Sequence, residues 1–99
     1  MNVSFLPAAR RDILLQVEYL LEECAYDAAV RFPVDVRDAT ELLARHPEAG
    51  TRVVADLRSW PLGRFPKVRL YYRTTGAELL VVRILHGARD LPSVLGEGE

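Results

Sequence analysis

The sequence predicts an α+β domain in which two antiparallel N-terminal helices pack on a three- to four-stranded antiparallel sheet. Two observations support this fold class. Before Gly50 apolar residues recur every three or four positions, as in an amphipathic helix, whereas after it they alternate, as in a strand. The chain of 99 residues has the length of a single domain, so we expect one domain over 1–99 with a loose tail at 96–99.

A short strand at residues 2–5 is expected to lead into the first helix. Pro7 suits the first turn of a helix, because the N–H that proline lacks would have no helical partner there. The apolar positions that follow are three or four residues apart and share one inward face: Ala9, Ile13, Val17, Leu20 and Cys24. Cys24 is therefore predicted to be a buried, apolar residue.

The second helix is expected to begin with Asp27 as its N-cap and to stop at Pro47 and Gly50. Its inward face follows the same spacing and comprises Ala29, Phe32, Val36, Ala39, Leu43 and His46. Pro33 lies inside this pattern. Because proline removes a helical hydrogen bond, we expect it to bend or interrupt the helix near its first two turns.

The second half of the chain is predicted to form an antiparallel meander. Residues 67–73 alternate apolar and polar side chains, residues 74–76 supply a turn, and residues 78–86 form the partner strand of a hairpin. Residues 57–62 are expected to form an earlier strand, in which Pro61 limits the pairing to an edge or a bulge.

The last strand is predicted to be apolar on both faces. Strict alternation places Leu80, Val82 and Ile84 on one face, and Leu79, Val81, Arg83 and Leu85 on the other. Two helices can cover only one face, so we expect the second face to stay exposed unless another chain covers it. The neighbouring strand would extend that second face with Arg69, Tyr71 and Arg73.

Composition excludes several classes of protein. The single cysteine cannot form an internal disulfide, and no apolar run approaches the roughly 18 residues that cross a membrane. The N-terminus lacks the features of a secretory signal, so a cytoplasmic location is expected. Cys24, His46 and His86 do not have the spacing of metal ligands, and no nucleophile or phosphate-loop motif is present. We therefore predict no metal, cofactor or catalytic residue.

The net charge of −1 hides an asymmetry along the chain. Residues 1–50 carry five arginines and nine acidic residues, whereas residues 51–90 carry eight basic and three acidic residues. The basic charge is thus concentrated in the predicted sheet, where arginine suits contacts with carboxylates, phosphates or bases.

Four segments in this order resemble the ParE branch of the ParE/RelE toxin superfamily: FLPAARRDI, LLARHPEAG, LRSWPLGRF and RILHGARDL. The resemblance covers nearly the whole chain. It implies a toxin of a bacterial type II toxin–antitoxin pair, neutralised by a ParD-like antitoxin in a toxin–antitoxin hetero-oligomer, with roles in plasmid stabilisation or stress response. ParE-like toxins poison DNA gyrase, which makes gyrase the expected target.

The alternative function is that of the RelE branch, whose members cut mRNA on the ribosome. Arg69 and Arg89 match two of the basic residues that RelE-like toxins use to hold the phosphate. Leu95 falls where those toxins have a tyrosine, and Lys67 is the only lysine of the chain. A leucine cannot transfer a proton or stabilise charge, which favours the gyrase-directed function.

The resemblance and the charge pattern together define two candidate surfaces. The candidate target-binding residues are Arg69, Arg73, Arg83, His86, Arg89 and Asp90, which could meet an acidic protein patch or DNA phosphates. Alternatively, Arg83 and Arg89 pair with Asp90 or Glu78 as structural links. The candidate antitoxin-binding residues are Leu79, Val81 and Leu85, for which ordinary strand composition or self-association is the alternative.

Overall fold

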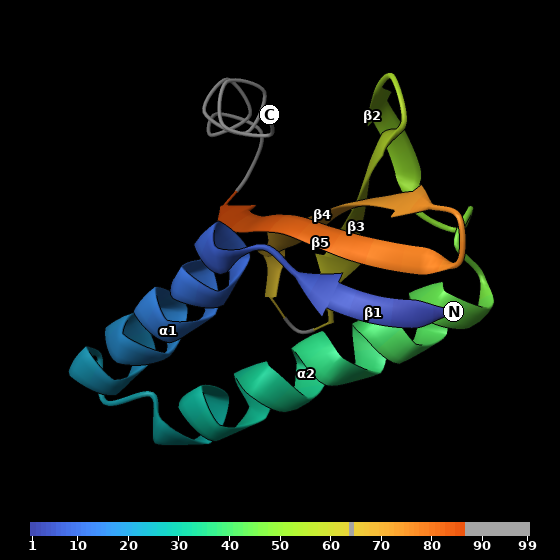
Figure 1. The fold of residues 1–99 in the computed structure, drawn as a ribbon. Helices are drawn as coiled ribbons and strands as arrows, with labels where there is room; N and C mark the ends of the chain where they lie inside the picture. The colour runs from blue at the N-terminus through green and yellow to red at the C-terminus, as the bar shows by residue number, and fades with distance from the viewer. Residues whose placement is uncertain (64, 87–99) are drawn as a thin grey trace.

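The structure is a computed structural model that describes residues 1–63 and 65–86. Two helices, α1 (Pro7–Glu22) and α2 (Tyr26–Arg45), cover one face of a sheet (Figure 1). The sheet has five strands: β1 (Asn2–Phe5), β2 (Thr51–Val54), β3 (Leu57–Leu62), β4 (Phe65–Thr75) and β5 (Glu78–His86). The predicted α+β class is confirmed, with five strands in place of three to four.

The strand order is β1-β5-β4-β3-β2, and every neighbouring pair is antiparallel except β1 and β5. The expected strand at residues 2–5 therefore joins the sheet as a parallel edge, with Val3 opposite Leu79 and Phe5 opposite Val81. The meander prediction omitted β2, whose four residues are mostly exposed and too few to show an alternating pattern.

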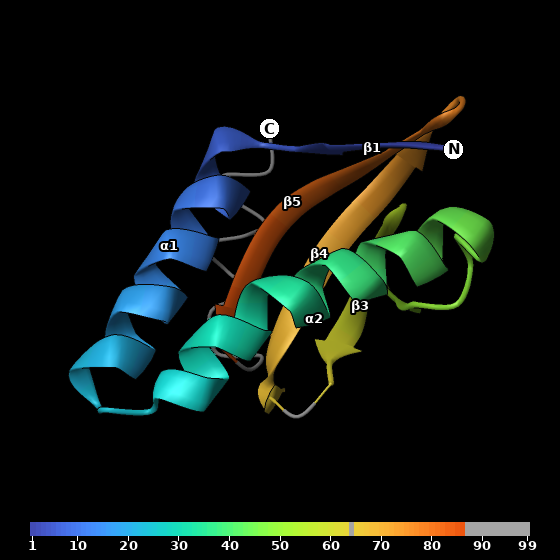
Figure 2. The same ribbon diagram turned by 90° about the horizontal axis from the view of Figure 1, so that it is seen from below.

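The main core lies between the helices and the sheet. Ala9 and Leu20 of α1 and Phe32 and Leu43 of α2 are buried there. The sheet contributes inward residues from three strands: Leu62, Val68, Leu70, Tyr72, Leu79, Val81 and Ile84. Figure 2 shows the helices in front of the sheet, with α2 crossing the strands and α1 beyond the end of β1.

A bulge in β5 changes the predicted division of its two faces. Tyr71 is opposite Arg83 and Tyr72 is opposite Val81, so Val82 is an extra residue without a partner position in β4. Leu79, Val81 and Ile84 consequently belong to the helix-side core. The strict alternation that placed Val81 and Ile84 on opposite faces is wrong, because it assumed a strand without a bulge.

A second, smaller cluster lies on the opposite face of the sheet. Leu57, Tyr71 and Val82 form it, and Leu6, Val53 and Leu85 pack against them. All three central residues are at most 2% exposed. The expectation that this face leaves apolar side chains open is therefore wrong at its centre.

Cys24 is exposed and does not belong to α1, which ends at Glu22. Its backbone adopts a left-handed conformation with φ of 58°, its N–H donates to Leu21 O, and the N–H of Ala25 donates to Leu20 O. These two bonds form the turn that commonly closes a helix. The predicted burial of Cys24 is wrong because α1 ends two residues earlier, at Glu22.

The second helix also differs in detail from its prediction. Its N-cap is Ala25, and Asp27 lies in the first turn, where a negative charge is favourable. Asp27 is thus not the cap. The helix continues through Pro33 to Arg45 without interruption. Within the described residues, no helix is long and apolar enough to cross a membrane.

Candidate functional site

Arg83 forms a buried ion pair with Asp12 that joins β5 to α1. Arg83 Nε lies 2.8 Å from Asp12 Oδ2, and Nη2 lies 3.1 Å from Oδ1. The two side chains are 14% and 8% exposed. A two-pronged contact of this kind is among the strongest that an arginine makes. The predicted structural alternative for Arg83 named Glu78 or Asp90 as its partner, whereas the structure provides Asp12.

The position of Asp12 follows from the short length of β1. That strand pairs with β5 only from Glu78 to Val81, and no other strand of the described residues borders the same edge of β5 beyond Val81. Asp12 Oδ2 accepts the N–H of Ile84 at 2.9 Å and thereby satisfies a donor at this edge. The sequence signal for this role is an acidic residue three positions after Ala9, within the inward spacing of the helix.

Arg69 and Arg73 lie on the sheet face opposite the helices. Both alternate along β4 with the core residues Leu70 and Tyr72. Arg69 donates from Nε and Nη2 to Ser59 Oγ at 3.1 and 3.0 Å. Arg73 Nε is buried and has no hydrogen-bond acceptor among the described residues. This face therefore presents two half-buried guanidinium groups, and Arg83 is not the third because it turns toward α1.

His86 is exposed at the end of β5 and borders a groove beside α1. The groove has a volume of about 300 Å³ and is lined by Asp12, Leu15, Gln16, Tyr19, Ile84, Leu85 and His86. Of the predicted target-binding residues, Arg69 and Arg73 share a face, and His86 lies nearer to the Arg83 ion pair. Arg89 and Asp90 lie outside the described residues.

The predicted antitoxin-binding residues do not share one surface. Leu79 and Val81 are fully buried beneath the helices, whereas Leu85 packs against the cluster on the other face. The expectation that all three are exposed together is wrong, and the bulge at Val82 is the reason.

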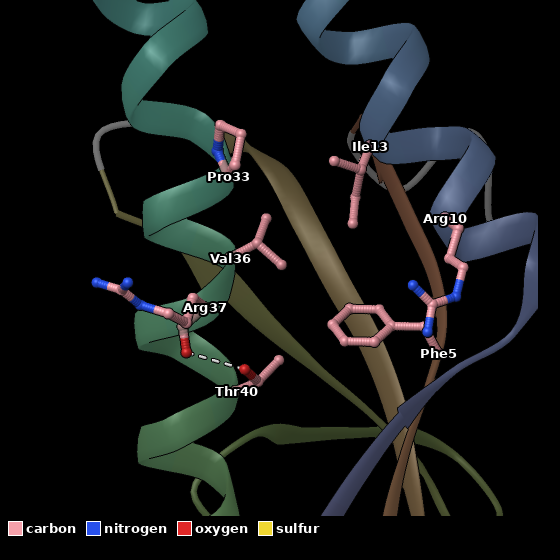
Figure 3. A pocket seen from close by; sticks show the side chains of 7 residues that line it. All are labelled: Phe5, Arg10, Ile13, Pro33, Val36, Arg37 and Thr40. Carbon is pink, nitrogen blue, oxygen red and sulfur yellow. Dashed lines mark hydrogen bonds between the residues drawn. The ribbon is translucent and has the colours of Figure 1, made fainter.

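A second cavity of about 220 Å³ lies between the two helices and β1. Phe5, Ile13 and Val36 point toward one another across it, while Arg37 points away (Figure 3). The guanidinium of Arg10 lies over the ring of Phe5, 5.4 Å from its centre. The cavity is thus an apolar hollow with one cationic group at its edge.

Tyr72 fixes the connection between α2 and β2 from inside the core. Its hydroxyl donates to Pro47 O at 2.7 Å and accepts from the N–H of Gly50 at 3.0 Å. Burial raises the pKa of this hydroxyl, while the Gly50 hydrogen bond and the charge of Arg58 partly oppose the shift. A Cβ at position 50 would lie 2.5 Å from the Tyr72 hydroxyl oxygen, so only glycine fits.

Comparisons with known proteins agree with this fold. The sequence model of one family, described as the ParE toxin of the type II toxin–antitoxin system parDE, matches residues 3–91. No curated protein sequence matches the chain. A solved structure of the chromosomal ParDE toxin–antitoxin system from P. aeruginosa is similar, with a TM-score of 0.75 and 19% identity over 89% of this chain and 97% of that chain. At this level of identity, the likeness shows a shared fold.

Proposed function

This chain belongs to the ParE toxin family of type II toxin–antitoxin systems, and we propose that it inhibits DNA gyrase and is neutralised by a ParD-like antitoxin. The family match over residues 3–91 is the observation that carries this proposal. In a toxin of this type, binding to the target causes the harm, and the antitoxin prevents it by occupying the toxin.

Two features support gyrase over ribosome-bound mRNA as the target. Leu95 occupies the position of the RelE tyrosine and cannot act as an acid or a base. Arg69, which matches a phosphate-holding residue of the RelE branch, is half-buried and directs two of its donors to Ser59. A guanidinium already held in this way is suited to recognition of a fixed partner surface.

We assign target contact to the sheet face that carries Arg69 and Arg73. Arg73 Nε has no acceptor among the described residues, and a buried donor without a partner is unfavourable by about 1–3 kcal/mol. A carboxylate of the target that binds the outer nitrogens of this guanidinium would give the group a charged partner. His86, and in the sequence Arg89 and Asp90, would extend the contact beyond β5.

The cavity between the helices and β1 supports an antitoxin partner. Its apolar lining by Phe5, Ile13 and Val36 fits an aliphatic or aromatic side chain, and Arg10 at its edge fits a neighbouring acidic residue. An antitoxin segment that alternates apolar and acidic residues matches both features. Such a segment would fold as it binds.

The experiment compares the two targets directly. Purified toxin should block supercoiling by gyrase and accumulate cleaved DNA, and premixed antitoxin should restore supercoiling. The Arg69→Ala/Arg73→Ala variant should lose this inhibition while circular dichroism shows that it remains folded. Arg52→Ala, which removes an exposed arginine from β2, is the matched control and should inhibit normally. Cuts in translated mRNA detected by primer extension, with gyrase unaffected, would overturn the proposal in favour of a RelE-type nuclease.

A further inference from the structure

The outward side of α1 is unusually apolar for a surface helix. Four large side chains of this helix, Leu14, Leu15, Tyr19 and Leu21, are 64, 55, 52 and 47% exposed. A single exposed leucine requires no explanation, but four on one helix form a patch of the kind that marks an interaction surface.

The charged residues of α1 are arranged in the opposite way to the one that the helix dipole favours. Arg10 and Arg11 lie near its N-terminus and Glu22 is its last residue, with no acidic residue in the first turn and no basic residue in the last. Helices are stabilised by the reverse arrangement. Among the described residues, neither Arg11 nor Glu22 forms a salt bridge. The stability of the isolated helix therefore does not explain these charges.

The apolar residues and the charges belong to one surface. Arg11, Leu15, Glu18 and Glu22 follow one another at steps of four, three and four residues, which places them on one ridge. Leu14 and Leu21 flank this ridge on one side and Tyr19 flanks it on the other, as the helical period requires. Figure 2 shows α1 at the outer edge of the molecule, beside β5. The ridge thus has a basic end at Arg11 and an acidic half at Glu18 and Glu22, with Leu15 between them and apolar side chains along both sides.

We propose that this ridge is the contact between two copies of the chain, with their α1 helices packed antiparallel. A twofold axis midway between Arg11 and Glu22 would set Leu15 of each copy opposite Glu18 of the other, and Leu14 beside Leu21 of the other. The same rotation would set Arg11 of each copy opposite Glu22 of the other, so that both pairs form together. A surface that is complementary to its own inverted copy in this way favours a symmetric dimer over an unrelated partner.

This contact leaves Arg69 and Arg73 open. Leu15 and Tyr19 border the groove beside β5 that Ile84, Leu85 and His86 also line, whereas Arg69 and Arg73 lie on the sheet face opposite the helices. The dimer would therefore present two copies of that face at once. The inference does not depend on what the toxin binds.

Sedimentation of the purified full-length chain between about 1 and 100 µM is the test. We expect a monomer that converts to a dimer with rising concentration. Arg11→Glu alone and Glu22→Arg alone should each raise the dissociation constant at least tenfold, about 1.4 kcal/mol, because each sets like charges opposite one another. The double variant Arg11→Glu/Glu22→Arg should recover the dimer, since the exchanged pairs are again complementary.

Matched controls separate this contact from misfolding. Arg52→Glu makes the same change of charge on exposed β2 and should dimerise normally. Circular dichroism should show unchanged helix content in every variant. A chain that stays monomeric throughout, or a double variant that fails to recover, would overturn the proposal. If the chain is monomeric and Arg11→Glu weakens antitoxin binding, the ridge belongs to the antitoxin instead.

Discussion

Asp12 and Arg83 show how one buried charge pair can determine the role of a residue that the sequence marks as functional. Both oxygen atoms of the Asp12 carboxylate accept hydrogen bonds from Arg83, and Oδ2 also accepts the N–H of Ile84. The ion pair thus occupies the edge of β5 beyond the last residue that pairs with β1. Arg83 therefore holds α1 to β5, and its contribution to a target contact would be indirect.

We predict that Arg83→Ala destabilises the protein by about 3–5 kcal/mol, because the buried Asp12 carboxylate would lose its compensating charge. Urea unfolding followed by circular dichroism measures this change. Arg52→Ala, which removes an exposed arginine, should change the free energy of unfolding by no more than about 0.5 kcal/mol. Equal stability of the two variants would show that the ion pair contributes nothing to the fold.

At the scale of elements, the junction between α1 and α2 depends on a residue in an unfavourable conformation. Cys24 occupies the left-handed position that follows a helix, where glycine is usual. A side chain in this region is unfavourable by about 1–2 kcal/mol, although glycine loses more backbone freedom on folding. The turn nevertheless forms, because two backbone hydrogen bonds and the packing of both helices determine it.

Cys24→Gly should accordingly stabilise the protein by up to about 1 kcal/mol and raise the melting temperature by a few degrees. Thermal unfolding measures the shift. Cys24→Ala removes the thiol but keeps the Cβ, so it should melt close to the original protein. If the alanine variant gains as much as the glycine variant, the thiol and not the backbone is responsible.

At the scale of the whole molecule, the elements with long regular patterns could be predicted and the irregular ones could not. The two helices, β3, and the hairpin of β4 and β5 follow from periodicity. The bulge at Val82 has no sequence signal, because the residues from Leu79 to Val82 are all apolar and fit either face of the strand. This one residue moved Val81 into the core and removed the apolar surface that alternation had predicted.

Only those parts of the candidate site that follow from the alternation within one strand could be predicted from the sequence. Arg69 and Arg73 share a face as expected, since β4 alternates regularly through both. The partner of Arg83 was missed, because Asp12 lies 71 residues away in the sequence and only the parallel placement of β1 brings α1 beside β5. Contacts between distant segments depend on topology, which composition and spacing do not contain.

The two halves of the molecule are also joined through Tyr72. Its hydroxyl in the core of β4 binds Pro47 O and Gly50 N–H, while Arg58 of β3 donates to Gly50 O at 2.8 Å. The segment between α2 and β2 is thus held in place by side chains of β3 and β4. Because burial raises the pKa of Tyr72, the folded protein retains this proton at a pH where the unfolded chain releases it.

The free energy of unfolding should therefore fall as the pH rises above about 10, the value for tyrosine in an unfolded chain, with Tyr72 contributing at most about 1.4 kcal/mol per pH unit. Tyr72→Phe should lower stability near neutral pH by about 1–3 kcal/mol, because Pro47 O and Gly50 N–H lose their partner. The variant lacks the titrating group, so its deficit in the free energy of unfolding relative to the original protein should narrow as the pH rises above about 10. Urea unfolding across this range measures the deficit, and Tyr26→Phe, at an exposed tyrosine, is the matched control. A deficit that stays constant or widens with pH would contradict a raised pKa for Tyr72.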